Sequence, residues 1–340
     1  MKSTTSYNYL ICFPGEYYPV IFEDTAACGD AVFVTWRVWK TLTRSLELYR
    51  WLPPLIRRPF FYLIVSQIIR KNRQASAVLE DPDKPPCFIL DRCFLRILEL
   101  GLYDEFRKEF PGSRVVVMFT DLISKCRNYG PGISRTGGRR GADLIYSFDP
   151  ADAMRYGLRF HDLPSSDFSE RFLPAEEEYE ILFIGKIKER REKILRIWEN
   201  LTGRGFHCAF FLIGVPKAQR KAFPPGIRCC DWIPYETYLR MEARSRIILE
   251  IVQSGSTGKT LRVNEAVILG KKLLSDNPHL KTCPVYDPDN MFVFAEPEDI
   301  PDEFLRHRAG EYPVELKKKI SLRTFLDDVG NDLHAVDEEK

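Results

Sequence analysis

The chain has 340 residues, a length that suits two globular domains of ordinary size. Hydrophobic residues make up 44% and charged residues 29%, which is typical of a soluble globular protein with buried apolar cores. The formal net charge is only +2, so the whole-molecule balance predicts neither nucleic-acid binding nor an acidic tail.

The cysteines and the apolar segments indicate in which cellular compartment the protein resides and whether it crosses a membrane. The nine cysteines are scattered and form no C-x-x-C pair, which excludes the usual zinc ribbon and disulfide framework and predicts a reducing, cytoplasmic environment. The first residues lack the long apolar core of a signal peptide. The most apolar window, Phe60–Ile69, has about half of the roughly twenty residues that a membrane-spanning helix needs. We therefore expect no transmembrane segment.

In the first half of the chain, short apolar runs alternate with helical patterns. A helix is expected over Phe94–Phe110, where apolar residues recur at helical spacing and a Pro-Gly pair ends the pattern. The segment Thr35–Asn72 is expected to be mostly helical, with breaks at its prolines, Pro59 among them. The predicted strands are Tyr9–Phe13, Cys87–Asp91, Val115–Thr120 and Asp143–Phe148.

A polar segment, residues 164–179, is predicted to link the two halves, because it contains three serines, two prolines and a run of glutamates. After this segment, apolar runs and helical patterns alternate again, and more regularly than in the first half. The predicted strands are Ile181–Ile184, Cys208–Leu212, Ile227–Cys230, Ile247–Val252, Lys272–Ser275 and Met291–Phe294. The expected helices are Glu189–Leu201, Lys217–Phe223, Tyr235–Ala243, Thr260–Leu269 and, at the end, Val314–Asp328.

Strands that alternate with crossover helices predict an α/β fold with parallel sheets. We expect two Rossmann-like domains that face each other across a cleft. The expected parts are an N-terminal domain (1–163), the linker (164–179), a C-terminal domain (180–312), and a helix that packs back with a tail (313–340). Ligands of such sheets bind outside the carboxyl ends of the strands, so functional residues are expected directly after strands.

The strongest local pattern is residues 247–277, IILEIVQSGSTGKTLRVNEAVILGKKLLSDN. An apolar strand is followed by a loop of small residues and by a helix that begins near Thr260. Backbone N–H groups at a helix start make an anion site, and Gly255 and Gly258 let the backbone approach a phosphate closely. Glu265 lies about two turns into the helix, where its carboxylate could accept hydrogen bonds from a ribose diol. The segment therefore predicts a nucleotide site.

This segment resembles the donor site of the GT-B glycosyltransferases, particularly the retaining bacterial enzymes of capsule and lipopolysaccharide assembly. Those enzymes carry the motif E-G-F-G-L-P-x-x-E-A-x-x-x-G-K-P-V. The segment TGKTLRVNEAVILGKKLL, which begins at Thr257, resembles this motif in the order and spacing of its glycines and its glutamate. Gly258 matches the phosphate-loop glycine and Glu265 the ribose-binding glutamate. Thr257 stands where the family has a first glutamate, which contacts the donor sugar. The resemblance implies a UDP- or GDP-sugar donor bound by the C-terminal domain, and leaves the donor sugar and the stereochemical outcome open.

Two further segments carry the resemblance. Residues 181–192, ILFIGKIKERRE, are similar to the family's strand-turn G-R-L-x-x-x-K-G, whose two cations hold the donor pyrophosphate. Lys186 and Arg191 would take these roles, and fixed cations would neutralise the departing diphosphate without a metal. Residues 228–251 resemble the base-contacting turn and short helix before the donor loop. The donor-binding residues thus implied are Gly185, Trp232, Ile233, Pro234, Ser256, Thr257, Gly258, Lys259, Thr260, Leu261 and Glu265.

The N-terminal domain, on the acceptor side, resembles the family only in architecture. Asp91 and Asp121 each end a predicted strand, where a catalytic base is expected, and Asp121 is our candidate. The basic, glycine-rich Arg127–Gly141 is either a surface loop or a loop that closes on an anionic ligand. Trp36–Arg73 combines aromatic and basic residues. That mixture suits an anionic membrane surface, where lipid-linked acceptors reside, as well as it suits a core with a basic rim.

Other interpretations of these residues stay open. GSTGKT is similar to the phosphate loop of nucleoside triphosphatases, but Gln253 stands where that motif has its first glycine. An NTP-dependent kinase or ATPase is therefore one alternative, and a catalytically silent GT-B-like partner protein is another, because the first glutamate is missing. The five histidines lack metal-ligand spacing, and the two Asp-Pro-Asp runs are predicted to be turns. We expect a cytoplasmic glycosyltransferase that acts on a surface glycan and can bind the inner face of the membrane peripherally.

Overall fold

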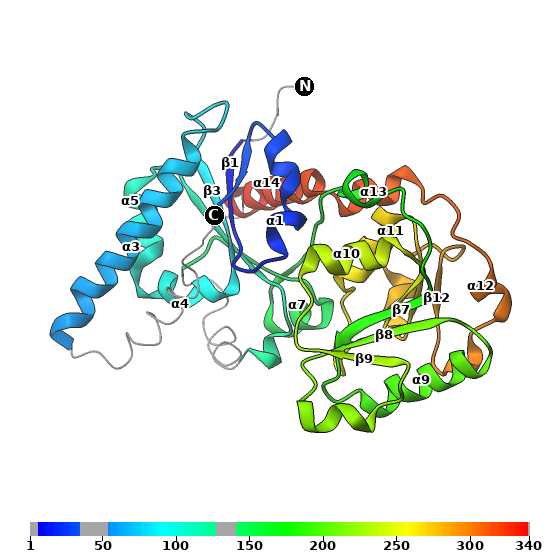
Figure 1. Cartoon of the computed structure of the whole chain (residues 1–340). Coiled ribbons are helices and arrows are strands. Elements are labelled where there is room, and N and C mark those ends of the chain that lie inside the picture. The colour runs from blue at the N-terminus through cyan, green and yellow to red at the C-terminus, as the bar shows by residue number, and fades with distance from the viewer. Residues whose placement is uncertain (1–5, 35–53, 127–140, 339–340) are drawn as a thin grey trace. The chain divides into compact units, whose positions relative to one another are not determined.

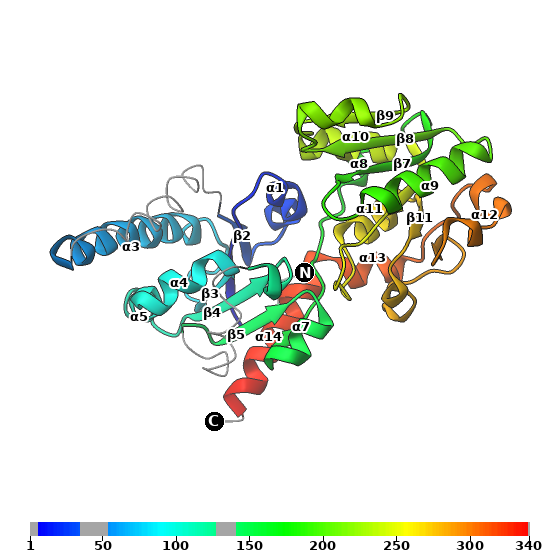
Figure 2. The ribbon, with the colours of Figure 1, turned by 90° about the horizontal axis from the view of Figure 1, so that it is seen from below.

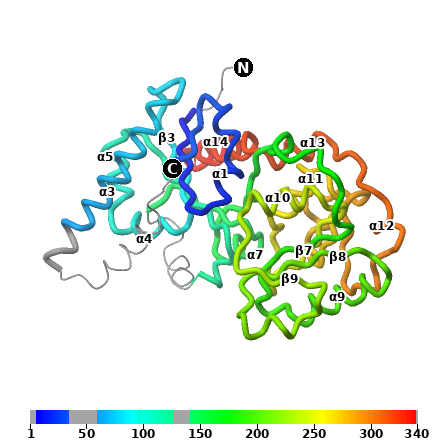
Figure 3. The backbone as a smooth tube through the Cα atoms, in the orientation of Figure 1, coloured from blue at the N-terminus to red at the C-terminus, as the bar shows by residue number. Residues whose placement is uncertain are grey.

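The structure is a computed structural model that describes residues 6–34, 54–126 and 141–338 (Figure 1). The chain forms two compact units. The first comprises Met1–Asp162 together with Leu322–Lys340, and the second is Leu163–Ser321. The trace in Figure 3 runs through the first unit, then the second, and ends in the first. Within the described part of the chain, no helix is long and apolar enough to cross a membrane.

The first unit is built on a six-stranded sheet in the order β2-β1-β3-β4-β5-β6, and every neighbouring pair is parallel. Its strands are β1 (Asn8–Cys12), β2 (Ala31–Phe33), β3 (Pro86–Asp91), β4 (Arg114–Phe119), β5 (Leu144–Ser147) and β6 (Arg159–Phe160). The four predicted strands are confirmed within one residue at each end. The short β2 and β6 escape prediction because two or three residues show no apolar pattern.

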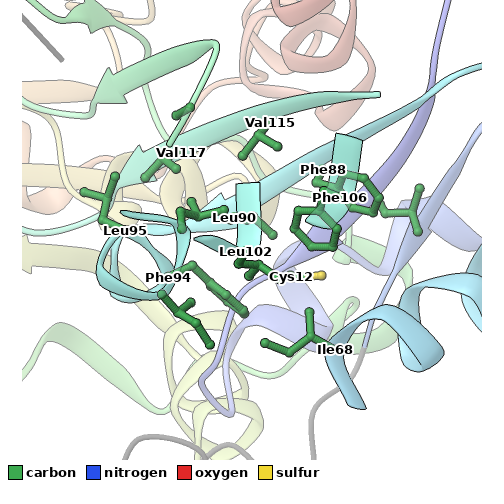
Figure 4. Close-up of a cluster of buried hydrophobic side chains, with 14 of the residues drawn as sticks. Cys12, Ile68, Phe88, Leu90, Phe94, Leu95, Leu102, Phe106, Val115 and Val117 are labelled. Carbon is green, nitrogen blue, oxygen red and sulfur yellow. The ribbon is translucent and has the colours of Figure 1, made fainter. Parts of the chain in front are cut away.

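Helices cover both faces of this sheet (Figure 2). One face packs against α3 (Pro54–Ser76), α4 (Leu95–Ile97) and α5 (Tyr103–Glu109), and Figure 4 shows this core. Within the core the rings of Phe88 and Phe106 stack with centroids 4.0 Å apart. The other face packs against α14 (Leu322–Glu338), whose Phe325 ring lies edge-on to Tyr146 at 6.4 Å. The short α1 (Tyr18–Ile21) and α7 (Pro150–Tyr156) follow β1 and β5.

Two helix predictions in this unit need correction. The helix expected over Phe94–Phe110 is split into short turns and α5, because Gly101 has a φ of 122°, outside the helical range. The break expected at Pro59 does not occur, since α3 continues through it and buries Phe61 and Ile68 on the sheet. Residues 35–53 of the predicted helical segment lie outside the described residues.

The second unit has a six-stranded parallel sheet in the order β12-β11-β10-β7-β8-β9. Its strands are β7 (Tyr179–Lys186), β8 (Cys208–Ile213), β9 (Ile227–Cys230), β10 (Ser245–Glu250), β11 (Lys272–Ser275) and β12 (Met291–Val293). All six predicted strands are therefore confirmed in position. Each unit has the parallel sheet and flanking helices of a Rossmann-like domain, which confirms the predicted α/β fold class.

The helices of the second unit also lie on both faces of its sheet. They are α8 (Ser169–Phe172), α9 (Arg191–Gly203), α10 (Tyr235–Ala243), α11 (Leu261–Leu269), α12 (Asp302–Arg306) and α13 (Val314–Ile320). Phe183 and Phe210 pack with α9, whereas Leu182 and Phe211 pack with α10 (Figure 1). The helix expected over Lys217–Phe223 is a 3-10 helix over Lys217–Ala222.

The segments at the borders of the units are folded. Within residues 164–179, Ser169–Phe172 form α8, and Phe168 and Phe172 are buried. The single helix predicted over Val314–Asp328 is two helices, because Ser321 is extended, with ψ of 150°. The first of them, α13, belongs to the second unit, and α14 belongs to the first.

Candidate functional site

The carboxyl ends of the parallel strands in the second unit meet at one edge of the sheet, where the predicted donor loop follows β10. Thr260 caps α11: its hydroxyl accepts from Arg262 N at 3.2 Å and donates to the Glu250 carboxylate. Glu250 is fully buried and also accepts from Ser275. Burial raises the pKa of the Glu250 carboxyl. The start of α11 is therefore tied to the ends of β10 and β11.

The loop itself is held from the neighbouring strand. Asp276 follows β11 and accepts from Val252 N at 2.7 Å, and Asn277 Nδ2 donates to Gly258 O at 3.1 Å. Gly255, at the tip, has a φ of 83°, which only glycine adopts readily. The loop between β10 and α11 is thus a fixed structure at the edge of the sheet, as an anion site at a helix start requires.

Three cations that the sequence analysis did not select gather at this edge. The Arg190 guanidinium donates to the carbonyl oxygens of Lys186, the last residue of β7, and of Ile251, directly after β10. Arg262 of α11 donates to the carbonyl oxygen of Ile184 in β7. Burial, and then the charge of Arg262, lower the pKa of Arg190. Both guanidinium groups thus donate to backbone carbonyl oxygens at the carboxyl end of β7.

The third cation, Lys193 of α9, pairs with the buried Asp276 carboxylate at 2.6 Å. Lys186 and Arg191, the predicted pair, are both exposed, and the Arg191 guanidinium lies over the Phe223 ring at 4.9 Å. The turn after β7 contains Lys188, which has a φ of 41°. Lys186 and Arg191, on either side of this turn, are exposed, whereas Arg190 and Lys193 bond to the edge of the sheet. The charge run KIKERREK was the available signal, and it did not show which cations face inward.

Lys259, the lysine of GSTGKT, is buried inside the second unit. Its amino group donates to Asn264 Oδ1 at 2.7 Å, and the Asn264 amide donates to the carbonyl oxygen of Leu163 at 2.9 Å. A phosphate-loop lysine must reach the phosphates of its ligand. The position of Lys259 therefore argues against the NTPase alternative.

Glu265 lies in a buried polar cluster between α10 and α11. Its side chain is 2% exposed, and its two oxygens accept from the hydroxyls of Tyr235 at 2.7 Å and Tyr238 at 3.0 Å. Burial raises the pKa of Glu265, and the charge of Arg262 opposes this effect. The second carboxyl of the cluster, Glu242, is also buried, and burial and the charge of Glu265 raise its pKa well above the ordinary value.

The predicted base-contacting turn, Trp232 to Pro234, joins β9 to α10 directly before Tyr235. The Trp232 side chain is 55% exposed, Pro234 is exposed and Ile233 is half-buried. An exposed indole after a strand end offers a surface on which a nucleobase can stack. Through Tyr235, this turn is connected to Glu265, so the structure brings these predicted residues into one part of the second unit.

In the first unit, the strand ends hold the two aspartates that the sequence singled out. Asp91 is the last residue of β3, is buried, and accepts from Cys93 N at 2.9 Å and from the Thr120 hydroxyl at 3.2 Å. Thr120 in turn accepts from Tyr18 at 3.0 Å, and Tyr18 from Tyr17 at 3.1 Å. Burial raises the pKa of Asp91. Both of its carboxylate oxygens are thus engaged inside the unit.

Asp121 is the more accessible of the two aspartates. It is half-buried, and its Oδ1 accepts from Leu122 N at 2.9 Å. Of the other first-unit predictions, residues 127–140 of the basic loop and 36–53 of the aromatic and basic segment lie outside the described residues. The Asp-Pro-Asp run at Asp287 is a turn, as predicted, in which the Asp287 carboxylate accepts from Asp289 N at 3.1 Å. Residues 6–34, 54–126 and 141–338 contain no group of three or more His, Cys, Asp or Glu side chains arranged to hold a metal ion.

No protein-family profile matches the chain, and no curated protein sequence does. Among solved structures, the chain is similar to the crystal structure of Anabaena Alr3699/HepE in complex with UDP and glucose, with 9% identity and a TM-score of 0.55 over 96% of this chain and 99% of that one. A Methanocaldococcus jannaschii UDP-GlcNAc 2-epimerase, in complex with UDP-GlcNAc and UDP, is 14% identical, with a TM-score of 0.47 over 94% of this chain and 99% of that one. The spinosyn rhamnosyltransferase SpnG is 12% identical, with a TM-score of 0.38 over 98% of this chain and 95% of that one. At these identities the likeness is one of fold, and the chain has the paired Rossmann-like domains of GT-B-like proteins.

Proposed function

We propose that this protein transfers a sugar from a nucleoside diphosphate sugar, UDP- or GDP-linked, to an acceptor hydroxyl. The observation that carries the proposal is the gathering of Arg190, Arg262 and Lys193 beside the donor loop. Cations at the carboxyl end of a strand attract an anion, and guanidinium groups bind phosphate oxygens in a bidentate way. A nucleoside diphosphate carries the charge that this edge of the sheet would neutralise.

The donor would lie along the carboxyl edge of the second-unit sheet. Its diphosphate would accept from the cations and from backbone N–H groups at Gly258–Leu261, where the helix dipole adds to the attraction. Ser256 and Thr257 would approach the sugar, and Gly185, near the end of β7, would face the donor. The nucleobase would stack on Trp232, and the ribose would bind Glu265.

In the reaction, the bond between the anomeric carbon and the diphosphate oxygen breaks, and the acceptor oxygen forms a new bond to that carbon. The departing diphosphate gains negative charge, which Arg190 and Arg262 would stabilise, with Lys186 and Arg191 as more distant charges. The acceptor proton would move to the Asp121 carboxylate. Because cations of the chain neutralise the leaving group, we propose that the reaction needs no divalent metal.

The acceptor that we propose is a surface glycan of the capsule or lipopolysaccharide type, handled in the cytoplasm, with peripheral binding to anionic lipid through Trp36–Arg73. One feature of the described part of that segment supports the proposal. A cavity of about 280 Å³ between α3 and α5 is lined by Tyr62, Val65 and Ile69 beside Arg70, and by Arg73 paired with Glu109 at 2.6 Å. Apolar and basic groups side by side suit the boundary between lipid headgroups and tails.

Nucleotide binding tests the proposal directly. Calorimetry with UDP, GDP, CMP, ADP and ATP, with magnesium or with EDTA, is expected to show metal-independent binding of one nucleoside diphosphate. Magnesium-dependent binding of ATP alone would favour the NTPase alternative, and binding of no nucleotide would favour the silent partner. Nuclear magnetic resonance of the bound sugar nucleotide then separates transfer or hydrolysis from a change of configuration within the sugar.

A further inference from the structure

The carboxylate of Glu265 is already bound to two hydroxyl groups. Tyr235 donates to Oε1 at 2.7 Å and Tyr238 to Oε2 at 3.0 Å, and the side chain is almost completely buried. An ionised carboxylate accepts hydrogen bonds at both oxygens, so two hydroxyls can be held at once. A ribose hydroxyl is the same kind of donor, and it therefore competes with these phenols for the carboxylate oxygens.

The two tyrosines are held to different degrees. Their rings stack, with centroids 5.7 Å apart and an angle of 18° between the planes. Tyr238 lies inside α10, and the Arg262 guanidinium lies over its ring at 5.8 Å. Tyr235 is the first residue of α10 and directly follows the turn that holds the exposed Trp232. Helix ends open more easily than helix interiors, so a ligand that rearranges this turn moves Tyr235 before Tyr238.

The charges of the cluster favour a neutral hydroxyl as the replacement. Arg262 lies near Glu265, and burial and the Glu265 charge keep the proton on the neighbouring Glu242 to a higher pH than usual. An additional charge buried at the Glu265 carboxylate itself would be costly. A ribose hydroxyl that replaces the Tyr235 hydroxyl changes no charge and restores the same hydrogen bond.

We infer that Tyr235 occupies the place of a donor ribose hydroxyl on Glu265 and that it must leave this carboxylate when the nucleotide binds. The inference rests on the proposed function, because it assumes a nucleoside diphosphate ligand. Tyr235 is then a residue that sets the affinity for nucleotides through the ribose diol, and Tyr238 is a fixed partner of Glu265. In the free protein, Tyr235 is hydrogen-bonded to Glu265, and this bond must break before the ribose can bind. The apparent affinity for the nucleotide is lowered by the free energy that this release requires.

The experiment compares Tyr235→Phe with its matched control Tyr238→Phe, since each removes one hydroxyl from the same carboxylate. Calorimetry measures the binding of UDP and GDP and of their 2′,3′-dideoxy forms, which have the diphosphate and base but no diol. Tyr235→Phe is expected to bind the preferred nucleotide about tenfold more tightly than wild type, equivalent to about 1.4 kcal/mol. The dideoxy form should gain nothing from this change, and Tyr238→Phe should give no gain with either form.

Three results would overturn the inference. One is an unchanged or weaker affinity of Tyr235→Phe in a protein whose wild type binds the nucleotide, which leaves the proposed function intact. Another is an equal gain with the dideoxy form, which would show that the diol is not involved. An equal gain in Tyr238→Phe would show that Tyr235 has no special position. Failure of wild type and all variants to bind any nucleoside diphosphate would instead refute the proposed function together with the inference.

Discussion

Replacing Arg190 by glutamine tests the centre of the proposed donor site. The Arg190 guanidinium joins the turn after β7 to the loop after β10 through the carbonyl oxygens of Lys186 and Ile251. Its Nε is buried and has no hydrogen-bond partner within the described part of the chain. Glutamine keeps part of the length and polarity but removes the charge.

The size of the effect follows from the chemistry of the contact. A hydrogen bond between a charged donor and acceptor contributes about 1.5–3 kcal/mol, which corresponds to a roughly 10- to 150-fold rise in the Kd for UDP. Arg196→Gln is the matched control, because it removes the same charge from α9 at a site that is 55% exposed and paired with Glu296 at 2.6 Å. An exposed pair contributes little, so the control should change the Kd by less than about twofold.

Isothermal titration calorimetry with UDP and with uridine separates a loss of affinity for the diphosphate from a loss of affinity for the nucleoside. Arg190→Gln should weaken UDP and leave uridine unchanged, because uridine has no phosphate. Wild-type affinity for UDP in Arg190→Gln would refute the assignment, and an equal loss for uridine would show that the loop itself had changed. Arg191→Gln, measured beside it, shows whether the exposed neighbour selected from the sequence contributes as well.

Three further predictions concern stability and catalysis. Burial raises the pKa of Glu242 above its ordinary 4.5. The protonated carboxyl therefore contributes its full stability below pH 4.5, and this contribution is lost as the pH rises through the folded-state pKa. Glu242→Gln should therefore raise the free energy of unfolding at pH 8 but not near pH 4.5; equal effects in urea unfolding at both pH values would contradict this. Phe325→Ala, at a fully buried site on α14, should cost about 3–5 kcal/mol in denaturant unfolding of the first unit, and a loss under about 1 kcal/mol would refute the packing argument. Asp121→Asn should slow sugar transfer about 100-fold without changing the Kd for UDP, and unchanged transfer in a kinetic assay would exclude Asp121 as the proton acceptor.

The strands were predictable from the sequence because parallel sheets bury both faces of each strand. Val115–Phe119, for example, is a continuous apolar run in which every side chain is inaccessible to solvent. The split of the helix expected over Phe94–Phe110 was not predictable from periodicity, since the apolar spacing continues across Gly101 while the backbone does not. The apolar pattern of the sequence therefore predicted the strands of both sheets, but it did not predict the break in the backbone at Gly101.

The site was predictable only where it depends on neighbouring residues. Small residues between an apolar strand and a helix predicted a loop there, and the structure has that loop between β10 and α11, with Thr260 capping α11 close to the predicted helix start. That Arg190 points inward while Arg191 is exposed depends on the turn at Lys188, whose φ of 41° no sequence rule for lysine suggests. The contact between Tyr235 and Glu265 joins residues 30 positions apart, and their spacing carries no signal for it. Side-chain direction and long-range pairing were thus the parts that required the structure.

The assignment of α14 to the first unit has a consequence for protein synthesis. The first unit needs Phe325 and Val329, which are buried in it, whereas the second unit is one uninterrupted segment, Leu163–Ser321. A ribosome that translates this chain releases the whole second unit before it releases the last helix of the first. The second unit can therefore complete its fold first, and until α14 arrives the earlier-made sheet has one uncovered apolar face that is open to chaperones or to aggregation.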